Sequence, residues 1–283
     1  MIPDKNRLIR FVVACVAAVP AHAGIIVFAS GAGANPAAIQ GSVDAFRVFI
    51  GGGNVAGANG SFGGVRREIN WDGVPDLFSQ PNNLPPGFFN SNSPRGVVFS
   101  TAGTGFLTSA DASNPTSTPT LFSDLNASYA GVFQTFSAER LFGVTGSNEM
   151  DVNFFVPGTA TPATVSAFGA VFVDNTFSTV PNCALLEAFN GNTSLGSFCA
   201  PVTTSGGLSF LGLATTGQDT ITRIRIHLGT GTLGTTQAST NEIVVMDDFI
   251  FSEPRNPVPE PATSALTLAG LASAALLARR RRG

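Results

Sequence analysis

Residues 220–228, TITRIRIHL, carry the pattern that decides the fold of this chain. Polar and apolar side chains alternate along the stretch, so they fall on opposite faces of an extended strand. Arg223, Arg225 and His227 share one face, and isoleucine and leucine side chains share the other. Such alternation is typical of a strand in an antiparallel sheet with one buried and one solvated face. We expect the three basic residues on the solvated face, where they could also form a small cationic patch for an anionic sugar.

Short runs of this kind recur along the chain, separated by clusters of Gly, Asn, Pro, Ser and Thr. They are rich in β-branched residues and Phe, which pleated sheets favour. No long stretch between residues 24 and 258 has the period of a helix. The pattern predicts an all-β fold of about twelve strands, arranged as a two-sheet jelly-roll-like sandwich. The expected strands are 25–29, 43–50, 65–71, 96–101, 139–144, 149–156, 164–173, 183–189, 194–199, 207–214, 220–228 and 242–251.

Long loops interrupt the strands at residues 51–64, 72–95 and 111–120. The first is Gly-rich, but it has no GxxxxGK[ST] pattern, so we expect a surface loop and not a phosphate site. The segment 67–76, REINWDGVPD, holds the only Trp of the chain. We expect Trp71 to be a core residue at the end of a strand.

Two cysteines, Cys183 and Cys199, flank the turn-forming pair Asn190-Gly191. A hairpin with a three-residue loop at 190–192 would place them directly opposite each other. Both ends of the chain predict export, and an oxidising compartment outside the cytoplasm favours the bond. We therefore predict a disulfide between Cys183 and Cys199.

The first 23 residues have the order of a secretory signal peptide. Basic residues precede the apolar run 11–19, which is too short to span a bilayer. The small residues that follow predict cleavage by signal peptidase between Ala23 and Gly24. We therefore expect residues 1–23 to form a signal helix that is removed from the mature protein. The alternative is an N-terminal helix that stays in the protein and is buried in its core.

The other end combines an extended motif, an apolar run and a basic cluster. Residues 262–278 carry no charge and are about as long as the shortest membrane helix. Arginines stay on the cytoplasmic side, so the body would lie outside. The sequence thus predicts a β-sandwich body at 24–254 and a tail at 255–283 with a C-terminal transmembrane helix at 262–278. The motif residues are Val258, Pro259, Glu260 and Pro261, and the basic stop is Arg279, Arg280, Arg281 and Arg282.

This tail resembles the PEP-CTERM sorting signal, the substrate of exosortase. Exosortase is a membrane transpeptidase-like enzyme of Gram-negative bacteria that make extracellular polysaccharide. The resemblance implies a protein anchored transiently in the inner membrane and then delivered to the cell surface or extracellular matrix. An ordinary single-pass anchor would explain the helix and arginines but not the Pro-Glu-Pro motif.

The charge distribution excludes one class of partner. Between residues 24 and 258 the chain has eight Arg, no Lys and sixteen Asp or Glu. A nucleic-acid-binding protein needs a basic face, which this acidic segment lacks. We therefore expect no nucleic-acid partner, whereas extracellular polysaccharide stays open as one.

Catalytic motifs are scarce in the body. It has one histidine, no cysteine pair with zinc-finger spacing and no GxSxG elbow, so we do not expect an enzyme. A glycan hydrolase that uses two carboxylates stays an alternative, because sequence cannot place such a pair.

One segment suggests a structural calcium ion. Residues 245–249, VMDDF, resemble the last strand of jelly-roll carbohydrate-binding modules, where an Asp ligates calcium. The resemblance points to Asp247 and Asp248, with Asp174 and Glu242 as further candidate oxygen ligands. The expected functions are thus a surface or matrix protein, a calcium-stabilised carbohydrate-binding module, or a hydrolase.

Overall fold

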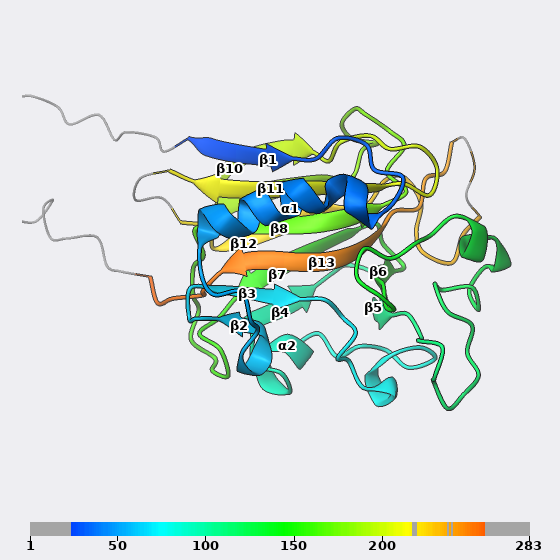
Figure 1. The fold of residues 1–283 in the computed structure, drawn as a ribbon, viewed down its shortest axis with the longest axis horizontal. Helices are drawn as coiled ribbons and strands as arrows, with labels where there is room; N and C mark the ends of the chain where they lie inside the picture. The colour runs from blue at the N-terminus through cyan, green and yellow to red at the C-terminus, as the bar shows by residue number, and fades with distance from the viewer. Residues whose placement is uncertain (1–23, 217–219, 237, 239, 258–283) are drawn as a thin grey trace, which may run out of the picture.

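The computed structural model describes residues 24–257 except 217–219, 237 and 239 (Figure 1). The predicted signal peptide up to Ala23, the motif 258–261, the apolar run 262–278 and the basic stop 279–282 lie outside the described residues. Within the described part, no helix is long and apolar enough to cross a membrane.

The described residues form two antiparallel sheets, of eight and five strands. The larger sheet has the order β1-β11-β8-β13-β3-β2, and β6 joins it through β13 and pairs with β5. Its strands are β1 Ile25–Ala29, β2 Ser61–Phe62, β3 Arg66–Ile69, β5 Gly105–Thr108, β6 Phe142–Thr145, β8 Ala167–Val173, β11 Leu208–Thr215 and β13 Val245–Ser252. The smaller sheet has the order β10-β9-β12-β7-β4. Its strands are β4 Val97–Ser100, β7 Glu149–Phe154, β9 Leu185–Asn190, β10 Thr193–Cys199 and β12 Arg223–His227.

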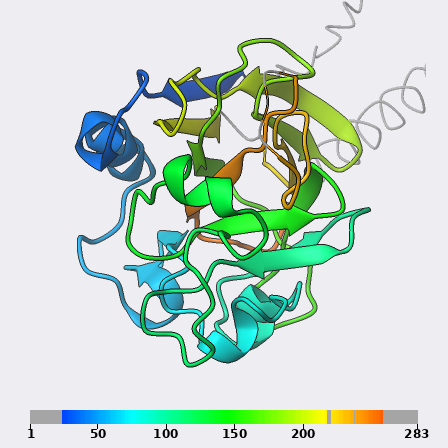
Figure 2. The ribbon, with the colours of Figure 1, turned by 90° about the vertical axis from the view of Figure 1, so that its right-hand side faces the viewer.

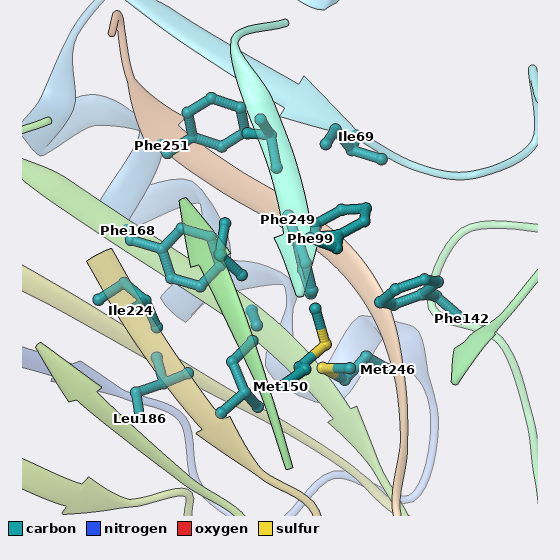
Figure 3. Close-up of a cluster of buried hydrophobic side chains, with 14 of the residues drawn as sticks. Ile69, Phe99, Phe142, Met150, Phe168, Leu186, Ile224, Met246, Phe249 and Phe251 are labelled. Atoms are coloured by element: carbon teal, nitrogen blue, oxygen red, sulfur yellow. The ribbon is translucent and has the colours of Figure 1, made fainter. Parts of the chain in front are cut away.

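Buried apolar side chains from both sheets fill the space between them (Figure 3). Phe168, Phe249 and Phe251 come from the larger sheet, and Leu186 and Ile224 from the smaller one. Their burial supplies the main favourable term for folding, since apolar area is worth roughly 25 cal/mol per Å² removed from water. The all-β, two-sheet sandwich predicted from the sequence is confirmed.

The alternation in β12 is also as predicted. Its isoleucine side chains are fully buried, and its basic side chains are partly exposed. The basic residues do not form a free cationic patch, because Asp151 of β7 lies 2.8 Å from Arg223 and 3.0 Å from Arg225. Glu149 lies 3.3 Å from His227.

The predicted strand 43–50 is wrong, because these residues belong to the helix α1, Pro36–Ile50. Asn35 caps the helix by accepting a hydrogen bond from the Ala38 N–H, and Pro36 takes the first helical position, where proline is favoured. Ile39, Val43 and Phe46 follow helical spacing and are fully buried on the outer face of the larger sheet. Figures 1 and 2 show α1 lying across this sheet on the outside of the sandwich.

Two glycines of the sheet make this packing possible. A Cβ at Gly169 of β8 or at Gly212 of β11 would lie 2.8 Å from the ring of Phe46. The ring therefore occupies space that any side chain would fill. An eight-residue apolar run such as 43–50 fits either period, and only the surface it packs against decides between strand and helix.

The strand expected at 139–144 begins later, at Phe142, because Arg140 is held by loop carboxylates. Its guanidinium lies 2.6 Å from Asp76 and 2.7 Å from Asp111. The other expected strands overlap observed ones. Three observed elements were not predicted: β5, β2 inside the Gly-rich loop, and the short helix α2, Phe88–Ser91.

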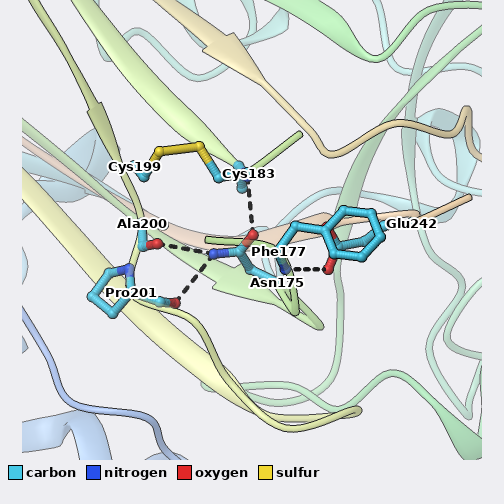
Figure 4. Close-up of a disulfide and its surroundings, with 8 residues drawn as sticks. Asn175, Phe177, Cys183, Cys199, Ala200, Pro201 and Glu242 are labelled. Carbon is cyan, nitrogen blue, oxygen red and sulfur yellow. Dashed lines mark hydrogen bonds between the residues drawn. A yellow bond between two sulfur atoms is a disulfide. The ribbon is translucent and has the colours of Figure 1, made fainter. Parts of the chain in front are cut away.

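The predicted disulfide between Cys183 and Cys199 is present, with Cα atoms 5.8 Å apart (Figure 4). The predicted three-residue loop is wrong: Thr193 pairs with Asn190, so the loop has two residues. A bulge follows between Ser194 and Gly196, and Cys199 then pairs with Leu185. The bond therefore joins Cys199 to a residue just before β9 and not to its direct cross-strand partner.

Candidate functional site

A β-bulge in β13 brings two carboxylates to one face of the larger sheet. Met246 pairs with Phe172 of β8, and Phe249 pairs with Ala170, so one extra residue of β13 lies between them. Asp247 and Asp248 therefore both stand opposite Val171. Both are almost fully buried, under α1 and residues 136–137.

Trp71 fixes the bulge from the core side. Its indole N–H donates a 2.9 Å hydrogen bond to the backbone carbonyl of Asp247. Its ring is 1% exposed and stacks on Phe142 with centroids 4.0 Å apart. The expectation that Trp71 is a core residue is confirmed, and its position gives the segment 67–76 a structural role that sequence reasoning missed.

The two bulge carboxylates share donors from one loop. Asp247 accepts from the backbone N–H of Phe136 at 2.6 Å and of Ser137 at 3.3 Å. The Ser137 hydroxyl lies 3.1 Å from Asp247 and 2.7 Å from Asp248. The remaining Asp248 oxygen is 3.5 Å from Arg47 of α1.

Burial perturbs both acids. Burial raises the pKa of Asp248 to about 6, although Ser137, Asp247 and Arg47 favour the charged form. Burial also raises the pKa of Asp247 well above its usual range, and the charge of Asp248 adds to this effect. Two neighbouring buried carboxyl groups interact strongly, so the pair releases its protons in coupled steps.

Glu68 of β3 extends this polar cluster. Arg47 donates to both of its oxygens, at 3.0 and 2.8 Å, and Arg66 donates at 2.8 Å. The same Arg47 nitrogen contacts both Glu68 and Asp248. One arginine on α1 therefore links carboxylates from two neighbouring strands.

Two adjoining cavities open beside this cluster, and we call them together the α1 cleft. They have volumes of about 580 and 530 Å³ and share Arg47, Phe62 and Glu68. The first is lined further by Asp44, Val48, Gly51, Gly52, Asn54 and Arg66. The second is lined further by Gln40, Ala56, Gly57, Asn59, Gly60, Asn70, Ser93, Arg95, Phe136, Ser137 and Asp248.

The Gly-rich loop 51–64 forms part of the wall of the α1 cleft and is not only a surface loop. In Figure 2 the chain leaves α1 and runs along the same side of the molecule toward β2 and β3. Gly52 has a φ of 102°, and a Cβ there would lie 2.5 Å from the carbonyl of Phe62. Glycine is required for the loop to approach β2 this closely.

The remaining candidate calcium ligands have other partners. Asp174 accepts a 2.6 Å hydrogen bond from the Gly206 N–H. Glu242 accepts from the N–H groups of Thr176 and Phe177, the second of which is drawn in Figure 4. Burial raises the pKa of both carboxyls. Each acid thus already has backbone N–H partners of its own.

The structure places these acids as two pairs, Asp247 with Asp248 and Asp174 with Glu242, and it does not assemble all four around one point. Among the residues that the structure describes, no group of three or more His, Cys, Asp or Glu could hold a metal ion. Calcium could still be held by two carboxylates and backbone carbonyls, since it accepts both ligand types. Calcium binding stays a prediction.

Comparison with known proteins identifies one segment. Residues 257–282 match the PEP-CTERM protein-sorting motif, and only Pro257 of this segment is among the described residues. No curated protein and no solved structure matches the chain. The motif marks exported proteins of Gram-negative bacteria that are anchored in the membrane before exosortase processes them. The chain is therefore an exported protein that carries a PEP-CTERM sorting motif at residues 257–282 and has exosortase as its processing partner.

Proposed function

We propose that this protein is a non-enzymatic cell-surface or matrix protein whose β-sandwich body binds extracellular polysaccharide in the α1 cleft. The observation that carries the proposal is the cleft itself. It is built on α1, β3 and the bulge of β13, and its lining combines polar and apolar surface. Its two cavities fall in the range of about 300–1,000 Å³ that is usual for ligand sites.

The chemistry of the lining suits a sugar. Side-chain amides of Gln40, Asn59 and Asn70 can both donate to and accept from sugar hydroxyls. The half-buried ring of Phe62 adds an apolar surface. A few polar groups that converge beside an aromatic ring are typical of small-molecule sites.

A blocking variant tests the site. Gln40→Trp places a bulky ring from α1 in the α1 cleft, whereas Ala37→Trp adds the same ring at an exposed position of α1 outside it. We expect the exported protein, purified from its host, to bind host polysaccharide by isothermal titration calorimetry. Gln40→Trp should abolish binding and Ala37→Trp should leave it unchanged. Equal binding by both variants would reject the cleft as the site.

A glycan hydrolase is the second candidate, and the short separation between two carboxylates of the α1 cleft favours it. Glu68 and Asp248 lie 2.8 and 3.5 Å from the same Arg47 nitrogen. Their oxygens are thus close enough for a glycosidase pair, whose carboxyl groups lie roughly 5–10 Å apart. We rank this function second because Arg47 and Arg66 occupy the oxygens of Glu68 that a nucleophile or base would need. Release of reducing ends by the wild type, lost in Glu68→Gln, would reverse the ranking.

Sorting and processing have their own test. We expect the mass of the protein recovered from its host to lack residues 1–23 and the segment after the sorting motif. Processing would then leave the body at the surface or in the matrix. An intact mass that includes residues 262–283 would reject processing and leave a simple membrane anchor.

A further inference from the structure

Arg95 differs from the other arginines around the α1 cleft because no carboxylate pairs with it among the described residues. Arg47 and Arg66 form ion pairs with Glu68, and Arg67 forms one with Glu253 at 2.8 Å. Within the described part of the chain, the contacts recorded for the Arg95 guanidinium are with a backbone carbonyl, a hydroxyl and an aromatic ring. An unpaired, partly buried cation at the wall of a cavity is a candidate anion-binding group.

The guanidinium of Arg95 is held in place on one side. Its Nε–H donates a 2.8 Å hydrogen bond to the backbone carbonyl of Glu68, and Nη1 donates to the Ser93 hydroxyl. It also lies over the ring of Phe89, with 5.1 Å between the guanidinium carbon and the ring centroid. These contacts leave N–H groups for a ligand in the cavity that Arg95 lines.

The loop above Arg95 is shaped to leave room for it. Gly60 has a φ of 61°, and a Cβ there would lie 2.6 Å from Nε of Arg95 and overlap the carbonyl oxygen of Glu68. Any side chain at position 60 would displace the guanidinium. Glycine therefore allows the loop to lie directly on the arginine.

The charge of Arg95 persists at neutral pH. Burial lowers its pKa to about 10, and the charge of Arg67 contributes to the shift. A bound anion would offset both the burial of the Arg95 charge and its repulsion by Arg67. Carboxylates suit this role because they pair with guanidinium groups through two parallel hydrogen bonds. Glu68 and Asp248 line the same cavity, which disfavours a dianion and favours a ligand with a single negative charge.

We propose that the α1 cleft selects an acidic polysaccharide, with the carboxylate of a uronic acid bound to the guanidinium of Arg95 and the sugar hydroxyls bound to the amides around it. This inference rests on the proposed function and narrows its ligand class. It also places the anion site away from Arg223 and Arg225, which already form ion pairs with Asp151.

The test compares an acidic polymer with its uncharged ester and with a sulfated polymer of a different sugar. The exported wild-type protein is titrated with polygalacturonate, with its methyl ester and with dextran sulfate. We expect polygalacturonate to bind at least about tenfold more tightly than the ester, because the ester lacks the charge that would pair with the guanidinium. Equal affinities for polygalacturonate and the ester, or tighter binding of dextran sulfate, would overturn the inference.

Variants locate the charge that is responsible. Arg95→Gln should weaken polygalacturonate binding at least about tenfold and leave ester binding unchanged. Arg225→Gln, on the smaller sheet, should change neither. An Arg95→Gln protein that is folded by circular dichroism and still binds polygalacturonate as the wild type does would refute the role of Arg95. If that variant does not fold, the binding of polymer and ester to the wild type still tests whether the protein selects a carboxylate.

The two proposals fail in different ways. If the wild type binds the ester as well as the acid and Gln40→Trp abolishes both, the cleft binds sugar and only the charge selection falls. If no polymer binds to the wild type, the proposed function falls as well.

Discussion

Replacing Asp248 by asparagine is expected to flatten the pH dependence of the protein's stability on the acidic side of neutrality. Burial raises the pKa of Asp248 from 3.8 to about 6, so the folded protein keeps a proton that the unfolded chain releases. The free energy of unfolding therefore falls as the pH rises from 3.8 to about 6. Asparagine has a similar shape and cannot ionise, so the part of this loss that Asp248 contributes should disappear, whereas burial of Asp247 still contributes.

The size of the effect follows from the pKa shift. One pKa unit corresponds to about 1.4 kcal/mol, so the ionisation of Asp248 costs the folded state on the order of 3 kcal/mol. The residue is 4% exposed, so solvent screens little of this cost. The asparagine oxygen can still accept from Ser137, whereas the ion pair with Arg47 is lost.

Urea unfolding followed by circular dichroism, in the presence of a chelator, measures the difference between about pH 4 and pH 7. The wild type should lose about 3 kcal/mol more than Asp248→Asn over this range. Asp44→Asn is the matched control, because it removes an exposed carboxylate that also contacts Arg47. Equal pH slopes for Asp248→Asn and the wild type would refute the account of the buried pair.

Further predictions concern the disulfide, the core, the cleft and calcium. Replacing Cys183 and Cys199 by serine should lower the free energy of unfolding by about 3 kcal/mol, as expected for closure of a short loop, whereas an unchanged urea midpoint would contradict this. Trp71→Phe should cost at least about 2 kcal/mol, because the carbonyl of Asp247 loses its buried donor and a cavity opens. Glu68→Gln should destabilise the fold by about 2 kcal/mol or more, since it leaves two arginines without their shared partner; a change below about 0.5 kcal/mol would mean that water replaces it. The calcium prediction expects a higher melting temperature in millimolar calcium than in chelator, and equal melting temperatures would reject it.

Sequence reasoning found the features that depend on neighbours along the chain. The alternation in 220–228 predicts one buried and one solvated face, and both are observed in β12. Cys183 and Cys199 flank a turn signal, so their pairing could be predicted although the register was not. Strand period and turn chemistry act over a few residues, which is why single-sequence reasoning detects them.

The α1 cleft was beyond such reasoning for a physical reason. Residues 43–50 fit a strand and a helix about equally well, and the helix is chosen because its apolar face covers the larger sheet. The bulge at Asp247 and Asp248 appears only when β13 pairs with β8. The pair of adjacent acids within an apolar strand is a local signal of this cluster, and from it the sequence predicts a calcium ligand, which stays a prediction.

The sequence alone predicted an N-terminal signal peptide, which stays a prediction, and it determined the sorting motif, the β-sandwich class and the cysteine pair, because each depends on a local run of residues. Only the tertiary structure decided which charges meet. Arg47, Glu68 and Asp248 are far apart along the chain and converge because β3 and β13 are neighbours under α1. The same packing leaves Arg95 without a carboxylate among the described residues, since Arg47 and Arg66 already share Glu68. Charge pairing depends on distances of a few ångströms in space, and the order of residues in the chain does not fix them.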